Sequence, residues 1–520
     1  MRHVLMLVFA LVLVSSPLVP NTQIATPVSQ YDAAELVAIK PELRDEVAAA
    51  LPFGMTEYQI HLTYSKTDAS AGFDMNGNVR ARITNTTTDP LIELPFRLYA
   101  NTPEQPEAMR IQSLRVDDAD SNWTLSVDNS VAMVPLSQGL EPGEQVTVEI
   151  EFAFTVPVDD QSRYGIFNHS STNDTTVMAH WYPVLAGRDP VTGWMLKPVS
   201  KFGDPVFTDA GMYDVTILSP GETTFITSGV ETNRVLHADG WVEITYNAKP
   251  SRDFVIVESG NLEPVMAEHE GTAITSWHMP NHQPAGEAVA GWTADSLSVF
   301  NPLLGEYPWV QLQVVEANVY GAAAVELPQM FIMGSSFYGT SNLDELPGFF
   351  EFTVAHEAVH MWFYSLVGNN QYDDAFIDEG LTNYLSGDVY FRQLHGNSVG
   401  NIAHQQFLYA PFLRMIDANT DVIVDFPTDD FPNGGSYSSA VYTKAPLGFH
   451  AIHQAMGDDA FFAGLRDYVE AFRFRVATPA NLEAALQAHA ETDIRDIWSH
   501  WFERREGGLD IRGAQSVCIA

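Results

Sequence analysis

His356, Glu357 and His360 form a His-Glu-x-x-His pattern in the second half of the sequence. On an α-helix, residues four apart lie on one face about one turn apart, so both imidazoles can reach one metal ion. Neutral imidazole nitrogens bind zinc at about 2.0–2.1 Å in tetrahedral sites, and Glu357 beside the ion can accept a proton from bound water. The pattern predicts a zinc centre with a general base, although so short a motif can also arise by chance.

A zinc site that activates water needs a third protein ligand and one open position. Eighteen residues separate His360 from Glu379, which stands where a second helix is expected to begin behind a loop. That helix can return alongside the first and bring its carboxylate to the ion. The alternative interpretation is a carboxylate that only favours the N-terminus of its own helix. With Glu379 as third ligand, the sequence predicts one Zn²⁺ ion.

Other polar residues near this pattern are weaker candidates. Zinc-bound histidines usually donate their second ring N–H to an acceptor, and Asn383, four residues after Glu379, can orient one of them. His450 and His453 stand three apart on another predicted helix, but no acidic residue or cysteine is near them in the sequence. We therefore predict no second metal site from that pair.

The elements around these residues indicate an α+β multidomain chain. Residues 263–508 predict a mostly helical domain with a small sheet, on helical periodicity at 287–303, 349–367, 440–456, 459–472 and 479–490 and a β segment at 309–319. Residues 58–262 instead contain short runs of β-branched and aromatic residues between turn residues, such as 58–64, 79–84, 145–154 and 213–218. These runs predict an N-terminal all-β, sandwich-like domain.

The two ends of the chain are expected to be accessory segments. Residues 1–20 combine a short basic start, an apolar run over 4–14 and small residues, which predicts a signal peptide and a secreted or extracytoplasmic protein. An uncleaved membrane anchor is the alternative. Residues 21–57 are interpreted as a linker and a helix over 32–50 that Pro41 interrupts, and residues 509–520 as a tail.

Composition excludes several classes of partner. With 520 residues the chain is long enough for two or more domains, and its net charge is -40, from 66 acidic against 26 basic residues. Nucleic acids and anionic membranes attract basic proteins, so we expect neither nucleic-acid binding nor strong membrane association after signal cleavage. The single cysteine, Cys518, cannot form an intrachain disulfide. The core and the metal must therefore supply the stability of an exported chain.

The ligand pattern resembles that of gluzincin metallopeptidases, which share a His-Glu-x-x-His motif followed after eighteen residues by Glu. Further segments resemble the aminopeptidase N (membrane alanyl aminopeptidase) family, over about residues 58–505. They are Trp181-Tyr-Pro183, the segments 202–207 and 213–216 in the β region, and the segments 300–315 and 497–502 of the helical region. The resemblance implies a thermolysin-like catalytic domain that binds zinc and takes peptides as substrates.

The same resemblance implies roles for three more residues. The family has a catalytic Tyr in a Tyr-x-Lys-Gly setting, which here is Tyr442 in Tyr442-Thr-Lys444-Ala445, and its phenol would donate to the oxyanion. Tyr437, five residues earlier, would line the same pocket. In the family's Gly-x-Met-Glu-Asn strand the Glu binds the substrate amine, and Glu326 matches it although the flanking Gly and Asn are changed. The alternative for Tyr442 is an ordinary aromatic residue at the start of a helix, and the alternative for Glu326 is a plain edge-strand carboxylate.

These residues together predict a zinc metallopeptidase that removes N-terminal residues from peptides. The family also presents a Gln from its β domain to the amine, and no matching motif is evident here. The sequence ends without the large helical C-terminal domain of longer members, so a zinc endopeptidase with an open cleft is the nearest alternative. A non-catalytic binding protein on the same fold is a third. The side-chain preference and the oligomeric state do not follow from the sequence.

Overall fold

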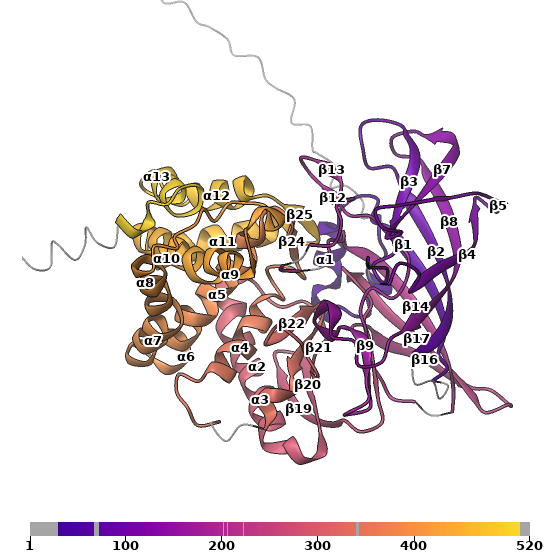
Figure 1. The fold of residues 1–520 in the computed structure, drawn as a ribbon, viewed down its shortest axis with the longest axis horizontal. Coiled ribbons are helices and arrows are strands. Elements are labelled where there is room, and N and C mark those ends of the chain that lie inside the picture. Colours follow the sequence, from indigo (N-terminus) through magenta and orange to yellow (C-terminus); the bar gives the residue numbers. More distant parts are fainter. Residues whose placement is uncertain are drawn as a thin grey trace, which may run out of the picture.

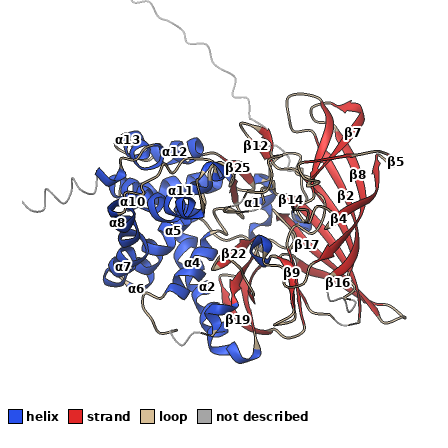
Figure 2. Ribbon diagram, viewed as in Figure 1, coloured by secondary structure: helices blue, strands red, loops and turns tan. Residues whose placement is uncertain are grey.

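The computed structural model describes residues 30–66, 72–103, 105–200, 202–204, 206–221, 223–339 and 343–509. The expected signal peptide and all of the expected tail except Leu509 lie outside these residues. A β-rich N-terminal part lies beside a mostly helical C-terminal part (Figures 1 and 2). The two-part α+β class expected from the sequence is therefore the observed one.

A long, twisted sheet forms the outer wall of the N-terminal part. Its strands follow the order β16 (Val230–Leu236), β17 (Trp241–Ser251), β14 (Gly211–Pro220), β1 (Glu57–Thr63), β2 (Phe73–Thr84), β8 (Gln145–Val156), β4 (Met109–Val116), β5 (Ala119–Asp120). Along β1, Tyr58, Ile60 and Leu62 are buried and alternate with more exposed residues. This alternation is that of a strand with one face on the core and one towards solvent.

Smaller sheets cover the inner face of the long sheet. One runs β11 (Val184–Leu185), β3 (Leu91–Arg97), β7 (Val131–Leu140), β6 (Thr124–Ser126), and another runs β15 (Phe225–Thr227), β18 (Ile256–Ser259), β10 (Thr175–Met178), β9 (Phe167–Ser170). A hairpin, β12 (Arg188–Asp189) with β13 (Gly193–Trp194), projects from this part. Phe152, Phe154 and Trp181 pack together in the shared core. The layers form a sandwich-like domain.

The C-terminal part begins with a mixed sheet that supports the zinc-motif helix. The strand order is β19 (Glu263–His269), β20 (Thr272–His278), β21 (Gln311–Ala317), β23 (Met330–Gly334), β22 (Ala324–Leu327). Helix α2 (Gln283–Leu304) packs on β19 and β20, and α4 (Phe349–Val359) packs between α2 and the edge strand β22. The edge strand therefore lies directly beside the helix that carries the His-Glu-x-x-His motif.

Short helices complete this part and enclose the site. They are α3 (Ser335–Tyr338), α5 (Glu379–Tyr384), α6 (Phe391–His395), α7 (Asn397–Ala403), α8 (Ala410–Asp417), α9 (Gly434–Ser438), α10 (Ala445–Met456), α11 (Asp458–Phe472), α12 (Pro479–Gln487) and α13 (Arg495–Trp498). Wider π-helical turns interrupt them at η6 (Leu385–Tyr390), η7 (His404–Tyr409), η9 (Ser439–Lys444) and η10 (Ser499–Glu503). Such turns occur frequently at functional sites.

Two predicted helices are shorter than the sequence suggested. The helix expected over 349–367 ends at Val359, because the amides of Ser365, Leu366 and Val367 bond to carbonyls five residues back in a tight turn. Residues 367–369 then form strand β24, which pairs with β25 (Arg475–Ala477). The helix expected over 32–50 is formed only in its last part, as α1 (Arg44–Ala50), behind the short turns η1 (Ala33–Glu35) and η2 (Pro41–Leu43). Pro41 has no amide N–H to continue a helix through this point.

A buried arginine joins the two parts of the chain. Arg252, just past the end of β17, donates from its guanidinium to the carbonyls of Tyr364, Leu366 and Arg475 in the C-terminal part. Gly368 packs against this guanidinium so closely that a Cβ there would lie 2.5 Å from Arg252 Cζ. This junction fixes how the β domain meets the zinc-motif turn.

Among the described residues, no helix has both the length and the apolar character needed to cross a bilayer.

Candidate metal centre and substrate pocket

Three side chains from two helices converge on one point. His356 and His360 lie at the end of α4, and Glu379 is the first residue of α5. His356 Nε2 is 3.1 Å from His360 Nε2 and 3.2 Å from Glu379 Oε2, and His360 Nε2 is 3.3 Å from the same oxygen. A tetrahedral ion with bonds of about 2.0–2.1 Å needs ligand atoms about 3.3–3.4 Å apart. The spacing of the three donor atoms therefore fits a zinc ion.

The charges around the centre also favour a cation. Burial alone would lower the pKa of His360, but Asp378 and Glu326 outweigh it and raise this pKa well above its usual value. Glu379 is buried too, yet the two imidazoles hold its pKa well below its usual range. The side chains thus form a buried, carboxylate-rich site of the kind that a divalent ion stabilises.

Asp378 orients one of the two histidines. Its Oδ1 lies 2.8 Å from His360 Nδ1, which also lies 3.0 Å from the carbonyl of Phe363. Such an acceptor fixes the imidazole so that Nε2 faces the metal. Asn383 lies near His356 and donates from Nδ2 to the carbonyl of Tyr442 at 2.7 Å. Its expected role as an acceptor for a zinc ligand stays a prediction.

Glu357 lines the pocket beside the two histidines without sharing their contact point. Its side chain is buried, and burial raises its pKa to about 8 despite the favourable charge of His360. A carboxylate whose pKa lies near neutrality can both accept and return a proton. The position of Glu357 is therefore suited to a general base.

Tyr442 and Tyr437 approach the centre from the opposite side, in η9 and α9. The Tyr442 hydroxyl donates to Glu379 Oε1, so this phenol lies directly beside the third ligand. The ring of Tyr437 lies 6.0 Å from that of Tyr442 and 6.4 Å from that of Phe202 in the β domain. Both tyrosines line the pocket, as the sequence led us to expect, and their roles stay predictions.

Two carboxyl groups lie at one side of the pocket. Glu326 is buried on the edge strand β22, and Asp204 comes from a loop of the β domain. The two are close enough to share a hydrogen bond. Burial, Glu379 and Asp378 raise the pKa of Asp204 to about 8, and burial and Asp204 raise that of Glu326 well above its usual value. We call Asp204 and Glu326 the acidic side of the pocket.

A glycine and a tyrosine place Asp204. Gly203 has a φ of +68°, which favours glycine, and a Cβ there would lie 2.4 Å from the Tyr437 hydroxyl oxygen. Tyr164, at a positive φ of 56°, donates its hydroxyl to the Gly203 carbonyl at 2.8 Å. The loop can thus pass close to Tyr437 and turn the next side chain towards Glu326.

An apolar wall forms the other side of the pocket. The rings of Phe352 and Phe407 stack with centroids 4.5 Å apart, and Phe349, which is half exposed, lies 5.8 Å from Phe352. Phe352 lies 6.1 Å from the His356 ring. Asp204 and Glu326 on the acidic side interact electrostatically with His360. We call Phe349, Phe352 and Phe407 the aromatic side. Both sides therefore border the pocket at the metal centre, and the aromatic side lies next to His356.

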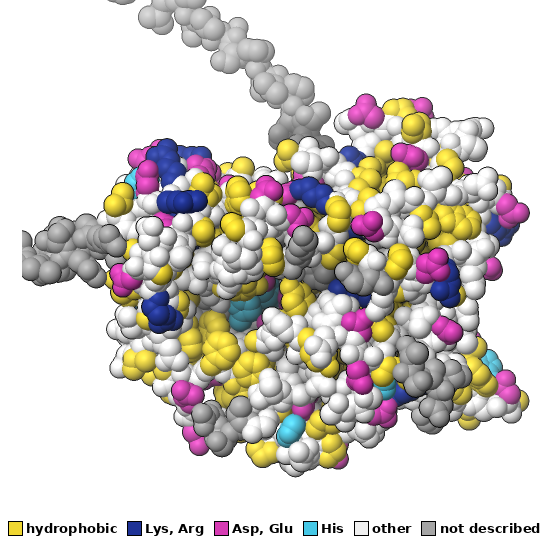
Figure 3. Space-filling model, in the orientation of Figure 1, with side chains coloured by type: hydrophobic (Ala, Val, Ile, Leu, Met, Phe, Trp, Pro, Cys, Tyr) yellow, Lys and Arg dark blue, Asp and Glu magenta, His cyan; other side chains and the backbone are white. Residues whose placement is uncertain are grey.

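The pocket between these sides has a volume of about 890 Å³. Figure 3 shows histidine atoms recessed near the middle of the molecule, with hydrophobic side chains beside them on the helical part. The lining comes from both parts of the chain, with Tyr164, Phe202 and Asp204 supplied by the β domain. The space suffices for a few residues of a peptide.

Asp378 and Asp204 were not identified from the sequence. Asp378 directly precedes Glu379 in the sequence. Its position next to the expected third ligand could have suggested that it lies at the metal centre. Asp204 lies in the 202–207 segment, which suggested only the family, and nothing in its spacing links it to the metal ligands. Only the packing of the β domain against α9 and β22 brings it to the pocket.

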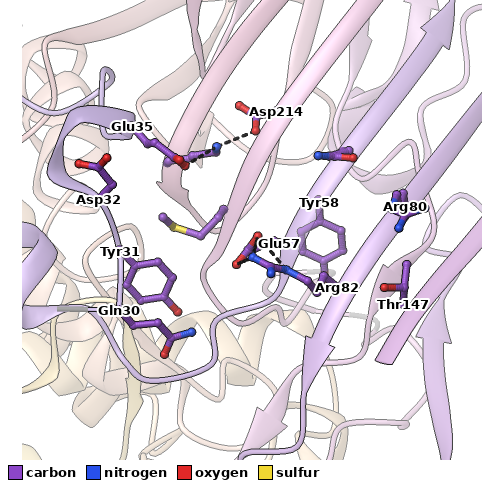
Figure 4. A pocket seen from close by; sticks show the side chains of 13 residues that line it. Gln30, Tyr31, Asp32, Glu35, Glu57, Tyr58, Arg80, Arg82, Thr147 and Asp214 are labelled. Carbon is purple, nitrogen blue, oxygen red and sulfur yellow. Dashed lines mark hydrogen bonds and ion pairs between the residues drawn. The ribbon is translucent and has the colours of Figure 1, made fainter. Parts of the chain in front are cut away.

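A separate hollow of about 610 Å³ lies on the β domain (Figure 4). Its basic residues are paired internally, since Arg82 contacts Glu57, and Lys249 contacts Glu35 and Asp214. Arg80 pairs with Glu149 at its margin. With these charges neutralised in place, the hollow offers no set of converging, unpaired groups.

Comparison with known proteins agrees with this geometry. A model of the peptidase family M1 domain matches residues 293–501, which include the three ligands, Glu357 and both tyrosines. The region 293–501 therefore belongs to peptidase family M1. The chain as a whole is only remotely similar to curated proteins: it is 22% identical over 413 residues to putative aminopeptidase-2 of Caenorhabditis elegans, a match that covers 74% of this chain and 20% of that protein.

Other relatives in family M1 are similarly remote. Membrane alanyl aminopeptidase of Manduca sexta is 29% identical over 146 residues, covering 27% of this chain and 14% of that protein. Aminopeptidase 2 of Saccharomyces cerevisiae is 20% identical over 303 residues, covering 56% and 31%. The chain thus spans a fifth to a third of the length of the first curated relatives.

Solved structures show the same two-domain fold. The M1 zinc metallopeptidase of Deinococcus radiodurans superposes with a TM-score of 0.64 at 18% identity, covering 87% of this chain and 94% of that one. Its E323A mutant bound to a Tyr-Ser-Ala substrate gives 0.62 at 17% identity, covering 87% and 95%. Membership of family M1 implies zinc as the metal, while the expected number of one ion stays a prediction.

Proposed function

We propose that this chain is a zinc aminopeptidase that removes residues one at a time from the free N-terminus of peptides. The observation that carries the proposal is the acidic side, where Asp204 and Glu326 line the same pocket as His356 and Glu379, two of the three metal ligands. A peptidase that cuts inside a chain has no need of two buried carboxyl groups at one end of its site.

The acidic side consists of two buried carboxyl groups whose ionised forms are disfavoured. Burial, Glu379 and Asp378 raise the pKa of Asp204, and burial and the charge of Asp204 raise that of Glu326. A substrate ammonium between them would relieve this repulsion and donate charge-assisted hydrogen bonds to both. Asp204 would then bind the substrate ammonium from the β domain, as the Gln of longer family members does. It would do so with a charged carboxylate in place of an amide.

The two sides of the pocket also set the direction of the substrate. With the ammonium at the acidic side, the first carbonyl would lie at the metal centre. The residue after the scissile bond would then extend towards the aromatic side near His356. Phe349, Phe352 and Phe407 would bury an apolar side chain at that second position.

The chemistry follows from the placement of the side chains. His356, His360 and Glu379 would hold the zinc ion, which when bound supplies a Lewis acid for the scissile carbonyl and its attacking water. Glu357 takes a proton from that water and later returns it to the leaving amine. Tyr442 donates a hydrogen bond to the developing oxyanion. Asp378 keeps His360 oriented throughout.

Product analysis tests this proposal against its alternatives. A zinc-loaded sample is incubated with a peptide of about eight residues, and the products are followed by mass spectrometry over time. We expect a ladder of products that shorten from the N-terminus only. Internal fragments from the start would indicate an endopeptidase with an open cleft. No cleavage of a peptide panel by zinc-loaded protein would favour a non-catalytic binding protein.

We also propose that the protein is exported. The support is the apolar run over residues 4–14 with its basic start and the small residues that follow it. N-terminal sequencing of the protein from its native host would test this. A mature N-terminus that lacks the apolar run over residues 4–14 is expected, and an intact Met1 in a cytosolic fraction would contradict export.

A further inference from the structure

A second group of metal-ligating side chains lies outside the pocket. Asp388 is in η6, His404 begins η7 and His450 is in α10, so the three come from segments far apart in the sequence. One potential donor atom from each lies within 4.8 Å of the other two. From the sequence, His450 seemed to have no acidic partner, because both of its partners are brought to it by the fold.

The imidazoles of His404 and His450 both face the same carboxylate oxygen of Asp388. His404 Nδ1 lies 2.9 Å and His450 Nδ1 3.5 Å from Asp388 Oδ2, and the two rings are 4.5 Å apart between centroids. These separations bracket the roughly 3.3–3.4 Å between ligands of a tetrahedral zinc ion. Among the described residues, His450 Nδ1 is buried and has no hydrogen-bond partner. A buried ring nitrogen without a hydrogen-bond partner, beside a carboxylate oxygen shared with a second imidazole, is available to bind an ion.

Arg392 holds the other oxygen of the same carboxylate. Its Nε lies 2.8 Å and its Nη2 2.7 Å from Asp388 Oδ1, so Oδ2 is turned towards the histidines. Ligating carboxylates are commonly fixed by such an outer hydrogen bond. Although burial opposes ionisation, His404 and Arg392 keep the pKa of Asp388 below its usual value. The carboxylate is thus charged and oriented.

The histidines are suited to bind an ion that arrives from solvent. Burial and the neighbouring His404 lower the pKa of His450 to about 4, so its imidazole is neutral at physiological pH, as a ligand must be. The side chains of His404 and His450 are 18% and 28% exposed, which leaves an entry path and room for a water as fourth ligand. Two imidazoles and a carboxylate suit zinc and related transition ions better than calcium or magnesium.

We propose that Asp388, His404 and His450 bind a second divalent ion, zinc or a related transition metal, separate from the catalytic centre. This ion would tie together η6, η7 and α10. Gln406 and Phe407, two and three residues after His404 in η7, line the substrate pocket. The second ion therefore positions the aromatic side of the pocket and takes no part in the bond cleavage itself.

Metal stoichiometry tests the proposal directly. The full chain is stripped with a strong chelator, reloaded with Zn²⁺, and dialysed against a weak chelator that removes surface-bound ions. Mass spectrometric metal analysis should then give two ions per wild-type chain. His404→Gln and His450→Gln should each retain one ion. Arg392→Gln should keep both ligand histidines but bind the second ion about 10- to 100-fold more weakly.

His453 supplies a matched control on the same helix. It lies one turn from His450, but its ring contacts the Tyr384 hydroxyl and Asp458 and not the Asp388 carboxylate. His453→Gln should therefore retain two ions, while His356→Gln should lose the catalytic one and keep the second. Co²⁺ loading provides a second readout, because each occupied site adds its own visible absorption.

One ion in the wild type, lost in His356→Gln and unchanged in His404→Gln, would overturn the proposal. So would a second ion that the His453→Gln control loses to the same extent as His450→Gln, because such an ion would not depend on the three ligands. Should either histidine variant fold poorly, the wild-type stoichiometry and the Arg392→Gln affinity still decide the question. None of these outcomes depends on whether the chain cleaves peptides.

Discussion

The acidic side and the aromatic side of the pocket are built in different ways. The acidic side pairs Asp204, from a β-domain loop, with Glu326, from an edge strand of the catalytic domain. The aromatic side comes wholly from the catalytic domain, with Phe349 and Phe352 on the zinc-motif helix itself. In the proposed function, recognition of charge would therefore depend on how the two domains meet, whereas recognition of apolar groups would depend on one helix and its neighbour.

This difference assigns separate tasks to the two sides. The acidic side would decide whether a peptide binds as an N-terminal substrate at all, because two buried carboxyl groups reject an uncharged or blocked end. The aromatic side would only grade substrates by their second residue, since apolar contacts add affinity without excluding alternatives. Glu357, between the two sides, would serve every substrate alike.

The largest effect is expected from Glu357→Gln, which removes the general base and keeps the shape of the pocket. The rate of peptide cleavage should fall by about 10²- to 10⁴-fold for all substrates. Zinc content should stay at the wild-type level, because Glu357 is not one of the three ligands. Steady-state kinetics and metal analysis on the same preparation check both parts. A variant with full activity would contradict the proposed mechanism.

A smaller and selective effect is expected from Asp204→Asn. It removes one charge that would face the ammonium, so kcat/KM for peptides with a free N-terminus should fall roughly 10- to 100-fold. Asp209, also in the β domain but interacting with Arg188 and Arg252, provides the control. Asp209→Asn should alter thermal stability more than substrate selectivity. Equal losses on free and blocked peptides would show that Asp204 acts only on the structure.

The smallest effect is expected from Phe407→Ala on the aromatic side. Loss of its stacking should lower kcat/KM for a peptide with Phe at the second position by about 3- to 10-fold. A peptide with Ala at that position should be affected much less. The comparison of the two peptides is the measurement. The control is Phe426→Ala, since Phe426 contacts Phe431 and does not line the pocket. A uniform loss on both peptides would contradict the assigned role.

All three candidate metal ligands could be named from the sequence, but only one residue of the acidic side could. The candidate ligands follow from their spacing in the sequence. His356 and His360 are four residues apart and share one helix face, and the eighteen residues before Glu379 allow a second helix to return beside the first. Glu326 was found through family resemblance, since one carboxylate on a strand has no local signal of its own. Asp204 could not be found, because its position depends on the packing of one domain against the other.

The same distinction applies to the fold. Alternation of apolar residues predicted the β domain and the core strands, because the period of a strand is a local property. The zinc-motif helix was predicted eight residues too long, since the turn after His360 depends on contacts with Asp378 and Arg252 that come from distant segments. The His450 cluster was missed for the same reason, as its partners lie 46 and 62 residues earlier.

The central claim is that the acidic side binds a substrate ammonium. It is tested most directly by kcat/KM of the zinc-loaded enzyme on one short peptide with a free or an acetylated N-terminus. We predict that acetylation lowers kcat/KM by roughly 100-fold or more, because it leaves both carboxyl groups without their partner. Equal cleavage of the two peptides would contradict the claim and identify the protein as an endopeptidase.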